Sequence, residues 1–393
     1  MGETRFEYDP YSYEIDLDPY PLYRRMRDEA PAYYNPRLDF WAFTRFHDCH
    51  DAFLDWQTYS SAQGTVLELM GDSEFSGSLI IFMDPPKQTR YRNLVSKAFT
   101  PARMRALEPR IRAITVEYLD RLQDRPRFDV VREFTAKLPM DVISTLLGIP
   151  KQDRDEVRGW SNDLLHRDPG NPMPTKRGFE SMLKLQAYFD EQMTERRRRP
   201  KDDMMTVLVE AEVDGEKLGD HEIHGFCNLI ATAGNETVTK LLASAFYWLN
   251  VFPDQRRVLV DEPAVIPNAV EEFLRFDPPS QYQGRTLMRD VEIHGATLPK
   301  GAKLMLVNGA SGRDERRFPD PDRLDVRREI EFHLGFGYGR HVCLGAFLAR
   351  MESRVALEEF FRRWQDYGVP EDGIERMHSS NVRGFSGLVL ETR

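Results

Sequence analysis

The sequence predicts a mainly α-helical protein with a minor β region. Most of residues 101–260 follow the helical period, and apolar side chains recur on one face in 110–122 and in 179–193. Strand patterns are confined to 40–44 and 290–308, and the second carries two turn signals, which is typical of a β-hairpin. No internal repeat, low-complexity tract or linker divides the 393 residues.

The elements between these landmarks are less regular. The first 60 residues carry aromatic segments interrupted by prolines. The four arginines at 196–199 are flanked by acidic residues, so they are interpreted as a solvated helix end that Pro200 closes. Four polar residues interrupt the apolar stretch 226–252, which is therefore too broken to span a membrane. The segment 313–328 is rich in Pro, Asp and Arg and is expected to be irregular.

Composition and charge exclude several classes of protein. The net charge of −10 argues against nucleic acid as a main partner. Three cysteines do not make a disulfide framework and indicate a reducing compartment. The N-terminus has no apolar leader, and Phe6 replaces the Ser or Thr of a myristoylation signal. We therefore expect a soluble, cytoplasmic protein without a membrane anchor.

One cysteine lies in a distinctive run at 336–345, F-G-Y-G-R-H-V-C-L-G. Glycines at 335, 337 and 339 allow positive φ and a close approach to a flat or bulky group. Apolar residues at helical spacing follow, so a helix is expected to begin at Cys343, where its dipole and unpaired N–H groups favour the thiolate. A thiolate in a glycine-rich pocket suits an axial ligand of haem iron.

Two other interpretations compete with haem ligation. A lone cysteine is most often a buried structural residue. Glycines at this spacing also occur in dinucleotide-binding loops, but no βαβ unit with a downstream acidic residue follows here.

The run resembles the haem-binding loop of cytochrome P450 monooxygenases, F-G-x-G-x-H/R-x-C-x-G, and fills every defined position. The resemblance implies that Cys343 is the axial ligand in haem b (iron protoporphyrin IX), with Phe336, Gly337 and Gly345 in the cofactor loop. It also implies one large P450 domain over residues 1–393, although length alone suggests two or three domains.

A second motif, Ala233-Gly234-Asn235-Glu236-Thr237, lies in the apolar helical stretch. Thr237 follows Ala233 by four residues, so its hydroxyl reaches back to that carbonyl and loosens the helix, and Gly234 leaves room for another group. A simple kink with a buried threonine explains these features too. The P450 pattern A-G-x-[DE]-T implies instead that O2 binds here, that Ala233 and Gly234 adjoin the cofactor, and that Thr237 and Glu236 are catalytic, with Glu236 feeding protons.

The third motif is Glu272-x-x-Arg275, whose spacing puts both charges on one helical face. It is either a surface ion pair of little energetic value or, by the P450 resemblance, a buried structural pair that a downstream arginine completes. Arg323 fits that role, although a leucine replaces the usual aromatic residue beside it, and Arg327 and Arg328 stay open.

Two haem propionates require cationic partners. The resemblance points to His341, Arg285 and Arg92, the last in the segment D-P-P-K-Q-T-R-Y-R at 84–92. Gln88 stands where the family usually has histidine. Because an amide donates a hydrogen bond but carries no charge, propionate binding at Gln88 is expected to be weak.

Substrate and electron donors follow from the resemblance only in outline. Substrate contacts are expected from 61–83, 229–233, 280–284 and 384–386, which are mostly apolar and favour an apolar small molecule of the terpenoid, steroid, fatty acyl or polyketide class. No flavin or nicotinamide domain fits in the chain, so electrons are expected from a separate ferredoxin and its reductase. The basic residues Arg340 and Arg350 are candidates to face that acidic partner.

The expected activity is therefore insertion of one oxygen atom from O2 into the substrate. One alternative is a peroxygenase that runs the same scaffold on peroxide, against which the intact Glu236-Thr237 pair argues. The other is a non-catalytic haem sensor or carrier, which has no use for that pair.

Overall fold

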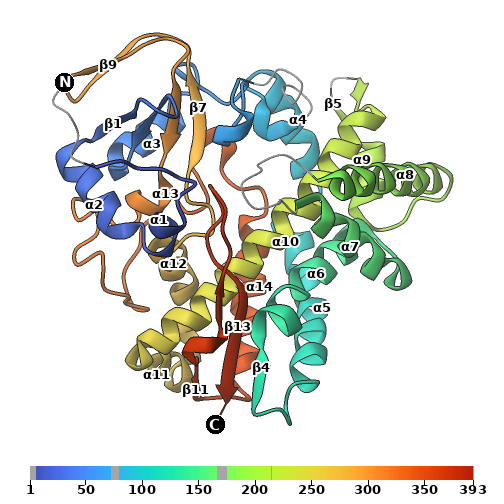
Figure 1. Cartoon of the computed structure of the whole chain (residues 1–393). Helices are drawn as coiled ribbons and strands as arrows, with labels where there is room; N and C mark the ends of the chain where they lie inside the picture. Colours follow the sequence, from blue (N-terminus) through green and yellow to red (C-terminus); the bar gives the residue numbers. More distant parts are fainter. Residues whose placement is uncertain (1–5, 72–78, 166–174, 214, 393) are drawn as a thin grey trace.

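The computed structural model describes residues 6–71, 79–165, 175–213 and 215–392. It confirms the predicted fold class, with 54% helix and 13% strand. Figure 1 shows the long helix α10 (Asp220–Val251) crossing the molecule diagonally, with helices α5 to α9 on one side and the N-terminal strands with α1 to α3 on the other.

The helices cover most of the chain. The remaining α-helices are α1 (Tyr13–Leu17), α2 (Tyr20–Glu29), α3 (Phe46–Leu54), α4 (Lys87–Ser96), α5 (Pro101–Asp120), α6 (Leu138–Leu147), α7 (Arg154–Leu165), α8 (Lys176–Arg198), α9 (Met204–Glu210), α11 (Pro253–Asp261), α12 (Ile266–Phe276), α13 (Asn308–Ser311) and α14 (Ala346–Phe361). A π-helical segment covers Val131–Thr135, and short 3₁₀ turns include Gly339–His341 directly before the cysteine. None of the described helices is both long enough and apolar enough to cross a membrane.

Thirteen short strands are described. They are β1 (Ala32–Asn35), β2 (Phe40–Phe43), β3 (Tyr59–Ser60), β4 (Arg127–Asp129), β5 (Glu212–Val213), β6 (Glu216–Lys217), β7 (Gln283–Leu287), β8 (Val291–Ile293), β9 (Ala296–Leu298), β10 (Lys303–Leu306), β11 (Tyr367–Gly368), β12 (Ile374–Arg376) and β13 (Phe385–Thr392). The main sheet has the order β1-β2-β10-β7-β3, and a second has β11-β13-β12 with β4 paired to β13.

The hairpin predicted over 290–308 is only partly correct. β8 and β9 pair antiparallel around His294 and Gly295, as expected. β10 does not extend this hairpin. It inserts between β2 and β7, pairing parallel with the former, because the turn at Gly301 redirects the chain.

Local signals set the ends of the long helices. The Gly219 N–H donates to the Glu222 carboxylate (2.8 Å) at the start of α10, and the Gly178 N–H donates to Thr175 Oγ1 (3.0 Å) at the start of α8. The end of α8 before Pro200 agrees with the prediction, but its arginine run is not fully solvated. Arg196 is 1% exposed and bonded to Asp203 (2.8 Å), since an otherwise unpaired charge is costly to bury.

Candidate active site

The predicted cysteine loop is a closed, hydrogen-bonded turn. The Cys343 N–H donates to the Phe336 carbonyl (2.9 Å), and the Gly337 N–H donates to the Leu334 carbonyl (2.8 Å). Gly337 and Gly339 have φ of +67° and +66°, so the predicted need for glycine is confirmed at these two positions. Gly345 precedes α14, whose first residue is three positions after Cys343 rather than at it.

The environment of the Cys343 thiol differs from the expectation. Burial among protein atoms raises its pKa, and a backbone hydrogen bond from Gly345 and the charges of Arg92 and Arg350 offset this only in part. The residue nevertheless counts as exposed, so the sulfur has many protein neighbours but keeps one open side. The protein alone does not make Cys343 a thiolate. A bound metal ion would favour the thiolate, because a coordinating thiol loses its proton.

Arg285 on β7 is a buried cation. It is 3% exposed, and its Nη1 donates to the Gly284 carbonyl (2.7 Å). Burial lowers the pKa of Arg285 to about 10, and the negative charge of Asp84, which raises this pKa, offsets the effect only in part. Among the described residues no carboxylate forms an ion pair with Arg285, because Asp84 is instead bonded to Ser60 and Ser61.

His341 and Arg92 lie beside Arg285. Burial, followed by the charges of Arg285 and Arg92, lowers the pKa of His341 to about 3, against a hydrogen bond with the Met83 backbone. His341 Nε2 is buried with no hydrogen-bond partner in the described part of the chain. Arg92 Nη2 donates to the Val342 carbonyl (2.7 Å), and burial lowers its pKa as well.

Two arginines and one histidine therefore converge beside the cysteine loop, and none of them is paired with a carboxylate of the described residues. The arginine charges disfavour protonation of His341, and these charges together with the unpartnered His341 nitrogen call for an anionic partner. The two propionates of haem supply two carboxylates, and the open side of the Cys343 sulfur supplies the metal ligand. The residues present thus fit haem.

Gln88 has a different environment from that of the cations. It is 1% exposed, and its Nε2 donates to the Arg340 carbonyl (2.7 Å). Together with the bond from Arg92 to Val342, this contact ties α4 to the cysteine loop. A propionate contact from Gln88 stays a prediction, and its observed bond is to the loop backbone.

The middle of α10 carries the second motif. Thr237 Oγ1 donates to the Ala233 carbonyl (2.8 Å), which is the predicted back-bond. Ala233 is exposed and Thr237 is half-buried, although most of α10 after Thr237 is buried, so one stripe of the helix lacks protein cover. A Cβ at Gly234 would lie 2.3 Å from Ile143 Cδ1 on α6, so Gly234 allows α6 to pack closely against α10, and its contact with the cofactor stays a prediction.

The third motif is buried, as the resemblance implied. Arg275 makes two bonds to the Glu272 carboxylate (2.6 and 2.7 Å), and both side chains are 0% exposed. The expected third member, Arg323, is wrong. Its side chain is exposed, and it contributes only its carbonyl, whereas Arg328 Nε lies 3.3 Å from the Glu272 carboxylate. Arg327 instead pairs with Glu262 on the surface.

Segments predicted to contact substrate lie side by side. The Gly284 N–H donates to the Thr65 carbonyl (2.7 Å), the Gln281 N–H donates to the Asn381 carbonyl (2.8 Å), and Ser280 bridges to Val382. Residues 72–78 of the expected segment 61–83 lie outside the described residues.

Two groups escaped the sequence analysis. Lys240 lies on α10 with its Nζ 2.9 Å from Glu236 Oε1, and the i,i+4 spacing in an apolar helix was the signal for it. Glu271 on α12 binds His333 (3.2 Å) and Arg350 (2.7 Å). Burial opposes its charge, but these two hydrogen bonds lower the pKa of Glu271 to about 2.

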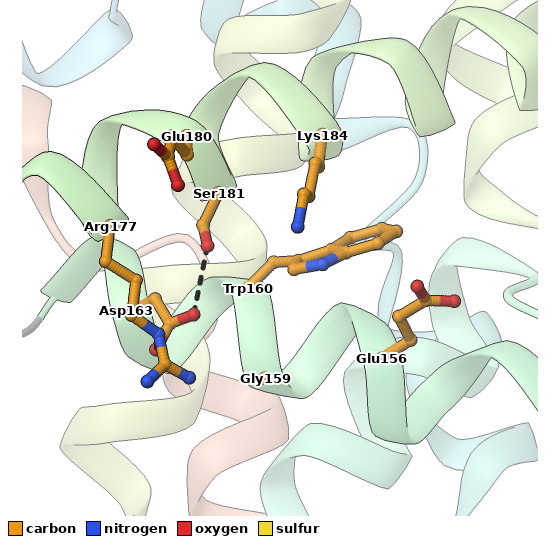
Figure 2. A pocket seen from close by; sticks show the side chains of 8 residues that line it. All are labelled: Glu156, Gly159, Trp160, Asp163, Arg177, Glu180, Ser181 and Lys184. Carbon is orange, nitrogen blue, oxygen red and sulfur yellow. Dashed lines mark hydrogen bonds and ion pairs between the residues drawn. The ribbon is translucent and has the colours of Figure 1, made fainter.

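A cavity of about 400 Å³ lies elsewhere, between α7 and α8 (Figure 2). Its lining includes Trp160, Glu156, Glu180, Lys184 and the Asp163–Ser181 hydrogen bond (3.0 Å). This lining is largely charged and includes none of the predicted site residues, so it does not fit an apolar substrate.

Comparison with known proteins gives consistent results. A sequence profile described as Cytochrome P450 matches residues 262–386. The chain is 42% identical to Putative cytochrome P450 123 of Mycobacterium tuberculosis over all of its length and 98% of the relative. The structure of CYP109Q5 from Chondromyces apiculatus is similar with a TM-score of 0.91 and 34% identity over 98% of both chains. That of CYP109E1 from Bacillus megaterium with corticosterone has a TM-score of 0.89 and 31% identity, covering 96% and 99%.

Proposed function

The chain belongs to the cytochrome P450 family of haem-thiolate monooxygenases, and from this premise we propose that it oxygenates an apolar small organic molecule. Its cofactor in this proposal is haem b, its oxidant is O2, and its electrons come from a separate ferredoxin and reductase. Residues 1–393 form one catalytic domain. Among the terpenoid, steroid, fatty acyl and polyketide classes, steroids are the first to test, because CYP109E1 has been solved with corticosterone.

Haem bound through a cysteine thiolate activates O2 for insertion into C–H bonds. In the proposal, Cys343 holds the metal, and Arg285, Arg92 and His341 hold the propionates. The uncovered stripe of α10 at Ala233 and Thr237 admits substrate and oxygen. The segments expected to line the substrate site are mostly apolar, so the proton supply is left to side chains of the protein.

The observation that carries the proposal is the acid–alcohol pair on α10. The Thr237 hydroxyl donates a hydrogen bond to the Ala233 carbonyl (2.8 Å), and such a bond loosens the helix at this turn. The hydroxyl oxygen can still accept a hydrogen bond from another group. Glu236 is adjacent and 22% exposed, so its carboxylate can exchange protons with solvent. The two residues therefore form a short route for protons to the uncovered stripe.

The electron donor is expected at the surface behind the cysteine loop. Arg340 is exposed there, whereas Arg350 is already bound bidentately by Glu271. The exposed side chains of Leu54 (50%) and Phe347 (39%) add apolar contact area near the loop. A partner with an acidic rim and an apolar centre fits this surface.

The test is turnover of corticosterone with a surrogate ferredoxin and reductase, comparing wild type, Thr237→Ala and Thr145→Ala. Thr145 on α6 makes the same back-bond, to Asp141 (2.7 Å), and is the matched control. We expect Thr237→Ala to divert electrons into hydrogen peroxide while Thr145→Ala keeps the wild-type yield. An unchanged product yield per electron in Thr237→Ala would contradict the assignment. Product formed only with added peroxide would indicate the peroxygenase, and no turnover of any apolar probe would indicate a sensor or carrier.

A further inference from the structure

Lys240 is a buried cation one turn after Glu236 on α10. Its side chain is 6% exposed, and its Nζ lies 2.9 Å from Glu236 Oε1. The same nitrogen donates to the Phe385 carbonyl (2.8 Å), 145 residues away in sequence. Lys240 therefore connects the acid of the proposed proton route to the start of β13.

Burying the Lys240 ammonium group costs free energy unless it keeps both of these contacts. A buried ammonium group is tolerated only when it is paired and hydrogen-bonded. Glu236 is the carboxylate that forms an ion pair with Lys240 in the described part of the chain. Phe385 is 0% exposed, so its carbonyl also depends on a protein donor.

The turn before β13 is fitted closely to the stem of this lysine. A Cβ at Gly384 would lie 2.6 Å from Lys240 Cβ and 2.9 Å from its Cγ and Cδ. Gly384 also has a φ of +155°, which L-residues rarely adopt. The 384–386 turn thus cannot move relative to α10 without disturbing Lys240. It adjoins residues 381–383, which pair with residues 279–281 at the start of the expected substrate segment 280–284.

We propose that Lys240 is a positioning residue that couples the 384–386 turn to Glu236. One side of its ammonium fixes the turn, and the other holds in one place the carboxylate of Glu236, the residue before Thr237 in α10. A substrate that shifts the turn changes the Lys240 contact and thereby the position of the acid. Proton supply is thus coordinated with substrate occupancy. The inference rests on the proposed role of Glu236.

The test is Lys240→Gln, which keeps a donor for the Phe385 carbonyl but removes the charge, with Lys240→Arg as the conservative variant. We expect Lys240→Gln to slow proton delivery roughly tenfold, less than the 10²–10⁴-fold typical of a general acid or base itself, because the acid is displaced but not removed. The readouts are the peroxide yield per electron and the solvent deuterium isotope effect on product formation, and both should rise. Lys240→Arg should restore most of the wild-type behaviour. Arg257→Met, which removes an exposed i,i+4 pair on α11, should change nothing.

Two further measurements decide the outcome. In a Glu236→Gln background, Lys240→Gln should cause no additional change in peroxide yield, because it acts through the acid. Equal effects in both backgrounds would overturn the proposal and leave Lys240 with a packing role. A double-mutant cycle of Glu236→Gln and Lys240→Gln on thermal unfolding measures the interaction energy of the ion pair without turnover. An interaction energy of zero would also overturn the proposal. A different result would contradict the proposed proton route and leave the ion pair intact. In that case Thr237→Ala and Glu236→Gln would keep the wild-type product yield per electron, while the thermal double-mutant cycle would still show a favourable Glu236–Lys240 interaction energy.

Discussion

The buried Glu272–Arg275–Arg328 set gives the sharpest prediction on stability. Arg275→Met removes a guanidinium that donates twice to Glu272 and also to the carbonyls of Gly312 (2.6 Å) and Pro321 (2.9 Å). Among the described residues, Glu272 then keeps the Asp325 N–H (2.9 Å) and the longer contact to Arg328. Removing one partner of a buried pair costs about 3–5 kcal/mol, because the other charge is left uncompensated.

That free energy converts into a measurable shift. With an unfolding entropy of roughly 2.1 cal/mol/K per residue, 393 residues correspond to about 0.8 kcal/mol/K, so the loss lowers Tm by about 4–6 °C. Arg328→Met removes one longer ionic contact and backbone bonds, about 1–2 kcal/mol, hence roughly 1–3 °C. Arg323→Met alters an exposed side chain and should stay within about 0.5 kcal/mol.

The assay is thermal unfolding of the haem-loaded variants followed by circular dichroism at one scan rate. The expected order of destabilisation is Arg275→Met, then Arg328→Met, then Arg323→Met. If Arg323→Met lowered Tm as much as Arg328→Met, the assignment of the third member would be wrong. If Arg275→Met left Tm unchanged, the reasoning on buried charge would be refuted.

Three other predictions concern the cofactor, pH and helix packing. Arg285→Ala should release haem to an acceptor protein at least tenfold faster, because charged hydrogen bonds are worth about 1.5–3 kcal/mol, whereas Gln88→Ala removes a neutral bond worth ~1 kcal/mol; equal rates would reverse this ranking. The folded protein lowers the pKa of Glu271 from 4.5 to about 2, so the charged Glu271 stabilises the fold fully above about pH 4.5, and this stabilisation is lost as pH falls towards 2. Glu271→Gln should therefore make the urea midpoint depend less on pH over that window. An unchanged dependence of the midpoint on pH would contradict the assignment. Gly234→Val should cost about 1–3 kcal/mol of unfolding free energy by overpacking α6 against α10, and adding Ile143→Ala should recover part of it; no recovery would place the strain elsewhere.

Sequence reasoning reached the parts of the site that depend on local chemistry. The glycines at 337 and 339 predict positive φ, and Thr237 predicts a hydrogen bond to the Ala233 carbonyl. Both effects act within four residues of the chain. The spacing of Glu272 and Arg275 placed both charges on one helical face, and the family resemblance alone implied that the pair is buried.

The failures share a physical cause: each depends on which distant segment packs against a residue. Arg323 and Arg328 are indistinguishable in sequence, and the irregular backbone between them decides which guanidinium turns inward. The close approach of Ile143 on α6 to Gly234 was also missed. Arg196 looked solvated until Asp203 was seen to bind it. Spacing along the chain carries no information on such partners.

The unpaired cations beside the cysteine loop have a consequence for the assembly of the enzyme. Without haem, the charges of Arg285 and Arg92 lie in a poorly hydrated place and hold His341 neutral, so the apoprotein carries an electrostatic penalty that the cofactor relieves. Any ligand that binds only the folded chain stabilises it by mass action. We therefore expect the unfolding midpoint to rise with haem concentration. The supply of cofactor then sets how much folded enzyme exists, as well as how much is active.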